Sequence, residues 1–174
     1  MSMQSRHTAT YADDGDVLRE LGAAALTMGS TGPLDALSVV AAATDNAITP
    51  EALHLALIRL AARHWLEAPP DDADDRAITL TPAGFAAYLH LHLPLYDDLL
   101  LQMKRIIVRH QQARSGSRLC LDAIAAAIGQ PLIVASGLAG ALQLAGLIGL
   151  ERGEDGGPAY VGQVSVFLAR QVRD

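Results

Sequence analysis

Two pairs of arginines have a spacing that suits the binding of phosphate groups. Arg59 and Arg63 lie four residues apart, which is about one turn of a helix, and so do Arg105 and Arg109. A guanidinium group donates paired hydrogen bonds to phosphate oxygens, so such pairs are typical of a nucleic-acid contact. With neighbouring polar side chains included, the candidate nucleic-acid-binding residues are Thr49, His54, Arg59, Arg63, Arg105 and Arg109.

The other reactive side chains do not form the pattern of a catalytic or metal site. His90 and His92 flank Leu91, and on a helix two such side chains point about 200° apart, too far to share an ion. Cys120 is the only cysteine, which excludes an internal disulfide and a cysteine-built zinc site. No serine, histidine and acid spacing suggests a catalytic triad, and the sequence has no glycine-rich phosphate loop. We therefore expect a protein that is not an enzyme and that has no cofactor and no bound metal.

The composition describes an apolar chain with an uneven charge. Of the 174 residues, 51% are hydrophobic and 18% are charged, and the formal net charge is −6. Residues 1–96 carry five arginines against twelve acids, whereas residues 97–174 carry eight bases against seven acids. An acidic chain is not expected to coat nucleic acid nonspecifically. Residues 1–15 lack the apolar core of a signal peptide and are predicted to be a disordered tail, so we expect a cytoplasmic protein.

Apolar periodicity and turn residues predict a mainly helical chain with short strands. Thr49 is expected to cap a helix that begins at Pro50, because proline suits the first helical position and Glu51 suits the positive end of the helix dipole. Other helices are predicted at 16–28, 82–92, 95–112, 121–128 and 136–145, with strands at 65–67, 77–81 and 147–151. Further apolar stretches run over 34–43 and 159–172.

The order helix, helix, turn, helix, strand, polar loop, strand occurs twice. Aligning Leu60 with Leu142 overlays residues 65–67 on 147–149. Residues 121–148, with Gly129 at the turn, resemble the helix-turn-helix pattern of bacterial winged-helix regulators. The segment from Thr79 to Gly84 and the start Thr49-Pro50-Glu51 resemble the MarR family. The resemblance implies a mainly α fold with small β wings, made of two winged-helix modules in tandem at 16–93 and 94–174.

The second module departs from the regulators in its recognition helix. The positions that contact DNA in such proteins fall here on Leu132, Gly137, Gly140 and Ala141. None of these side chains can make a charge-assisted contact, so we predict an interaction surface that meets the first module or a second chain. The wing of the first module, at 68–76, carries four aspartates against one arginine and would repel phosphate.

Two functions remain open from the sequence. The resemblance implies a transcription regulator that binds double-stranded DNA as a homodimer. The charge pattern instead favours a protein-interaction module built from repurposed winged helices that does not contact DNA. The apolar segment 132–150 has the hydropathy of a membrane span, but Gln143, its glycines and the helix-turn-helix pattern favour a buried helix pair, so no membrane contact is expected.

Overall fold

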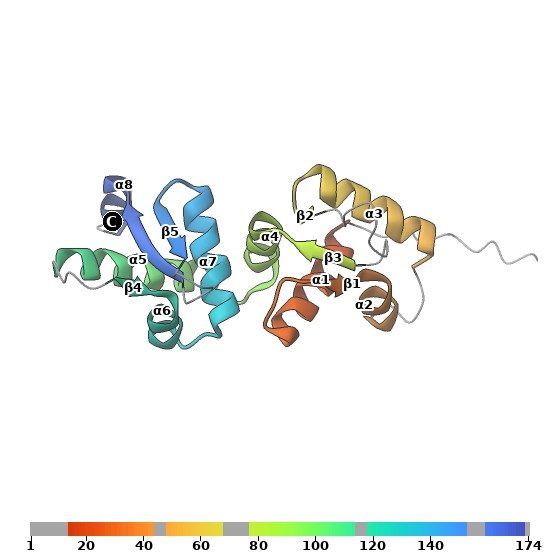
Figure 1. Ribbon diagram of the computed structural model, residues 1–174, viewed down its shortest axis with the longest axis horizontal. Coiled ribbons are helices and arrows are strands. Elements are labelled where there is room, and N and C mark those ends of the chain that lie inside the picture. Colours follow the sequence, from red (N-terminus) through yellow and green to blue (C-terminus); the bar gives the residue numbers. More distant parts are fainter. Residues whose placement is uncertain (1–13, 44–47, 68–76, 114–117, 153–158, 173–174) are drawn as a thin grey trace, which may run out of the picture.

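The computed structural model describes residues 14–43, 48–67, 77–113, 118–152 and 159–172. Within these residues the chain is mainly helical, with two small antiparallel sheets of three strands each. This confirms the mainly α class with small β elements. Figure 1 shows an elongated molecule in which the two halves of the sequence lie at opposite ends.

The first half of the chain arranges four helices around one small sheet. In order, its elements are α1 (Asp14–Met28), β1 (Leu34–Asp35), α2 (Ala36–Ala43), α3 (Pro50–Ala62), β2 (Leu66–Glu67), β3 (Ala77–Leu80) and α4 (Pro82–His92). The sheet order is β1-β3-β2, with Leu34 opposite Ile78 and Leu66 opposite Leu80. All four of these side chains are buried, so the sheet turns one apolar side to the helices.

Two threonines fix the starts of α3 and α4 in the same way. Thr49 accepts a hydrogen bond from the Ala52 N–H at 3.2 Å, and Thr81 accepts one from the Gly84 N–H at 3.0 Å. A proline follows each threonine at the first helical position, where its missing N–H costs nothing. The predicted start of the first of these helices is therefore confirmed.

The second half of the chain repeats this order of elements. Its elements are α5 (Tyr96–Gln112), β4 (Leu119–Cys120), α6 (Leu121–Ile128), α7 (Leu132–Leu144), β5 (Ile148–Arg152), β6 (Ala159–Val164) and α8 (Val166–Gln171). The sheet order is β4-β6-β5, so the third strand again lies in the middle. Gly129 ends α6 in the left-handed conformation, at the turn that the sequence predicted.

Helix α4 connects the two halves. It follows β3 in the first half, and it packs against α7 of the second half, as Figure 1 shows. The buried apolar side chains of both halves belong to one continuous cluster, and no polar side chain is buried among the described residues. No single helix in these parts of the chain is long and apolar enough to span a membrane. Helices α6 and α7 reach that length only together, with a bend of 109° between them.

Some boundaries differ from those predicted. The two-residue strands β1 and β4 were not predicted, because an alternation of period two cannot be recognised in two residues. Helix α7 begins at Leu132 and not at residue 136, because the aliphatic residues directly after Pro131 already belong to its first turn. The predicted terminal stretch 159–172 divides into a strand and a helix at Ser165, which caps α8.

Candidate functional site

The outer face of α3 is the surface that the sequence predicted as a nucleic-acid contact. Leu53, Ala56 and Leu60 are buried and attach the helix to the core. The side chains at the intervening positions point outward, as expected for a period of 3.6 residues. We call this outer face the α3 face; its exposed residues are Glu51, His54, Leu55, Ile58, Arg59, Ala62 and Arg63.

The α3 face has large apolar side chains at its centre, which base and phosphate contacts do not require. Leu55 is 47% exposed and Ile58 is 52% exposed, and both lie in the middle of the helix. Nothing in the described residues covers these side chains. Large exposed aliphatic groups at the centre of a helix face are typical of a surface that meets another protein.

Both arginines of the α3 face contact one carboxylate. Arg59 Nε lies 2.6 Å from Asp14 Oδ1, and Arg63 Nη2 lies 3.3 Å from Asp14 Oδ2. The Asp14 side chain is only 12% exposed, and the Arg63 guanidinium also stacks over the Trp65 ring at 5.4 Å. Two guanidinium groups of the α3 face thus share the single carboxylate of Asp14. The Asp14 carboxylate already pairs with both guanidinium groups, so a phosphate would have to compete with it.

Asp14 was not recognised from the sequence as a partner of these arginines. Its position in the first turn of α1 also gives it a favourable interaction with the helix dipole. Residue 14 is 45 positions from Arg59, and only the packing of α1 against α3 brings them together. No local pattern in the sequence carries that information.

The structure does not assemble all six predicted nucleic-acid-binding residues. His54, Arg59 and Arg63 share the α3 face, and Thr49 is occupied as the helix cap. The other two, Arg105 and Arg109, are exposed on α5, which lies at the opposite end of the molecule from α3 (Figure 1). The aspartate-rich loop predicted as a wing, residues 68–76, lies outside the described residues.

The predicted interaction residues on α7 have different surroundings. Gly137 and Gly140 are buried, Ala141 is partly exposed, and Leu132 at the start of the helix is 46% exposed. Any Cβ at Gly137 would collide with Leu89 Cδ1 and would lie 2.8 Å from the Phe85 ring, and both of these residues belong to α4. Gly137 therefore lets α7 approach α4 closely, and this part of α7 meets the first half of the same chain.

The two histidines of α4 make contacts with aromatic rings. The His90 ring lies 5.0 Å from that of Tyr96, and the His92 ring lies 5.4 Å from that of Tyr88. Burial raises the pKa of Tyr88, and the charge of Glu20 raises it further. Among the residues that the structure describes, no three histidine, cysteine or acidic side chains come together as metal ligands.

Comparison with known proteins gives no relative. No family model, curated protein or solved structure matches this chain. Its function is therefore inferred from the α3 face and from the packing of α7.

Proposed function

We propose that the chain consists of two winged-helix modules in tandem. The order α-β-α-α-β-β-α occurs in both halves, and in both sheets the third strand lies between the first and the second. In that arrangement α3 and α7 occupy the positions of recognition helices, and the wings lie between β2 and β3 and between β5 and β6.

We infer that this tandem unit is a non-enzymatic protein-interaction module that associates through the α3 face. The observation that carries the proposal is the exposure of Leu55 and Ile58 on a helix that would face DNA in a regulator. The corresponding helix α7 is uncharged and packs against α4 at Gly137. Helix α7 thus lacks the side chains that base contacts require, and the centre of the α3 face is aliphatic.

The charges on the α3 face favour a second copy of the chain as the partner. Glu51 lies near the start of the helix, whereas Arg59 and Arg63 lie near its end. In an antiparallel pair of α3 helices related by a two-fold axis, Leu55 and Ile58 would meet at the centre. Glu51 of each copy would then lie opposite the arginines of the other copy. Such a contact is self-complementary, as a two-fold interface must be.

Changing Ile58→Asp in the α3 face is expected to produce a monomer. The aspartate would place a charge at the centre of the proposed interface, whereas the side chain is exposed within one chain and can be replaced without damage to the core. Light scattering after gel filtration would measure the mass, and we expect twice the chain mass of 18.3 kDa for the wild type. Leu144→Asp, at an exposed leucine on α7, is the matched control and should remain dimeric. A wild-type monomer at concentrations of about 0.1 mM would contradict the proposal.

DNA binding is the second candidate function, because Arg59 and Arg63 are about half exposed on a helix in a recognition position. A titration against random-sequence duplex at about 50 mM and about 200 mM salt separates the two candidates. The interaction module predicts no salt-dependent binding by the folded wild type. A DNA-binding protein would show affinity that falls steeply with salt, is lost in an Arg59→Gln/Arg63→Gln double variant, and increases in Asp14→Asn. That combined result would replace the first proposal with the second.

A further inference from the structure

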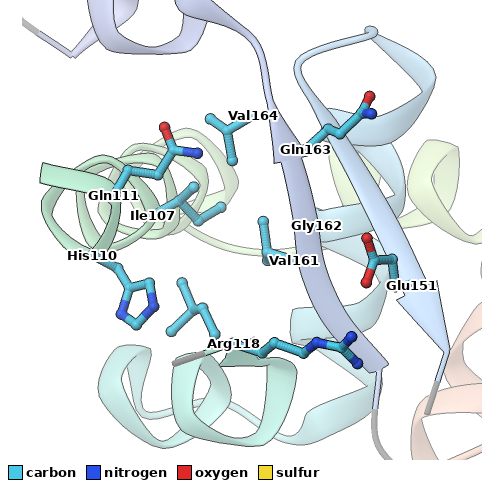
Figure 2. Close-up of a pocket in the computed structure, with 10 residues that line it drawn as sticks. Ile107, His110, Gln111, Arg118, Glu151, Val161, Gly162, Gln163 and Val164 are labelled. Atoms are coloured by element: carbon cyan, nitrogen blue, oxygen red, sulfur yellow. The ribbon is translucent and has the colours of Figure 1, made fainter. Parts of the chain in front are cut away.

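A pocket of about 480 Å³ lies between α5 and the sheet of the second half. Figure 2 shows Ile107, His110 and Gln111 of α5 on one side of it, with β6 crossing the other side. The volume is within the range of small-molecule sites, about 300–1,000 Å³. The pocket is distant from the α3 face, so binding of a ligand there would be separate from the proposed association of two chains.

The pocket combines an apolar wall with polar side chains at its edge. Ile107 and Val161, both less than a tenth exposed, contribute aliphatic surface from α5 and β6. His110, Gln111 and Gln163 contribute polar side chains that are able to donate or accept hydrogen bonds. This combination is typical of a site that encloses an apolar group and orients it by a few polar contacts.

Two opposite charges lie on the same side of the pocket. Figure 2 shows the side chains of Arg118 and Glu151 across the pocket from α5. The Arg118 guanidinium lies over the Tyr160 ring at 5.9 Å, and among the described residues it forms no ion pair with Glu151. The ring contact leaves the hydrogen-bond donors at the edge of the guanidinium available to a ligand.

Gly162 provides the space that the Glu151 carboxylate occupies. A Cβ at position 162 would lie 2.5 Å from Glu151 Oε1 and 2.9 Å from Glu151 Cδ. Any other residue would therefore push the carboxylate away from β6. The glycine keeps this carboxylate close to β6 at the edge of the pocket, on the sheet face opposite to Val161.

We propose that this pocket binds a small zwitterion, namely a free amino acid or a dipeptide with an apolar side chain. The carboxylate of the ligand would pair with Arg118, its ammonium group with Glu151, and its side chain would lie against Ile107 and Val161. A simple organic anion would be repelled by Glu151, and a simple amine by Arg118. A ligand that carries both charges satisfies both groups at once.

The test compares phenylalanine with two analogues that each lack one charge, 3-phenylpropionate and phenethylamine. Calorimetric titration of the full chain with phenylalanine, leucine and the dipeptide Leu-Leu should detect binding at millimolar concentration or tighter. Each single-charge analogue should bind at least about tenfold more weakly than phenylalanine. Absence of binding by all three zwitterions to the folded protein would overturn the proposal.

Two variants test separately whether Arg118 binds the ligand carboxylate and whether Glu151 binds the ligand ammonium group. Arg118→Gln should weaken the binding of phenylalanine at least about tenfold and should leave the weak binding of phenethylamine unchanged or stronger. Glu151→Gln should also weaken the binding of phenylalanine, but it should leave the weak binding of 3-phenylpropionate unchanged or make it stronger. Arg170→Gln and Glu67→Gln remove exposed charges outside the pocket and serve as matched controls that should bind like the wild type. Phenylalanine binding that survives both pocket variants would place the ligand elsewhere and overturn the proposal.

Discussion

Gly84→Ala is expected to destabilise the chain by about 3 kcal/mol or more, although alanine normally favours a helix over glycine. Gly84 lies in the first turn of α4, where a Cβ would collide with the carbonyl oxygen of Trp65 and would lie 2.8 Å from its carbonyl carbon. These are backbone atoms, and the same Trp65 carbonyl accepts a hydrogen bond from the Thr81 N–H at 3.0 Å. The backbone on both sides is therefore held in place, and the clash cannot be relieved by a change of rotamer.

Denaturant unfolding followed by circular dichroism would measure this effect as a lower midpoint with a similar slope. Gly140→Ala, at a buried helical glycine with its nearest neighbour, Pro82 Cβ, 3.8 Å from the added Cβ, is the control. A Gly84→Ala protein as stable as the wild type would show that α4 does not begin in contact with the Trp65 carbonyl.

Gly137→Ala and Gly140→Ala, one turn apart on α7, are expected to change stability in opposite directions. The first adds a methyl group against Leu89 and 2.8–2.9 Å from the Phe85 ring, so we expect a loss of about 1–3 kcal/mol through overpacking. The second adds a methyl group in ordinary contact distance, so we expect a gain of up to about 1 kcal/mol from the better helix propensity of alanine.

The difference in unfolding free energy between these two variants measures how closely α7 packs on α4. It is read from two unfolding midpoints of otherwise identical chains, so errors in the extrapolated free energy largely cancel. Equal effects of the two substitutions would mean that the halves of the molecule do not meet at Gly137.

The sequence predicted the ends of helices correctly where the signal is local. The pair Thr49-Pro50 marked the start of α3, and Gly129 marked the turn after α6, because a cap and a left-handed glycine act over four or five residues. The predicted range of α6, Leu121–Ile128, agrees with the structure because its buried residues follow one regular stripe.

The sequence was insufficient where the determining contact is distant. The small residues of α7 predicted a packing face, but only the fold shows that Gly137 meets Leu89 and Phe85. The spacing of Arg59 and Arg63 predicted a phosphate contact, and the same geometry also accommodates the Asp14 carboxylate. A pair of arginines does not specify which oxyanion it holds. The pocket at Arg118 likewise depends on strands that are far apart in the sequence.

The position of α4 between the halves also bears on how the chain is synthesised. Ribosomes release the N-terminal elements first, and such elements generally fold as soon as they are complete. When the first half has emerged, the side of α4 that will receive Gly137 has no partner, because α7 is still to be made. During that interval the nascent chain presents an apolar helix surface to other proteins, and a truncated product that stops before α7 would present it permanently.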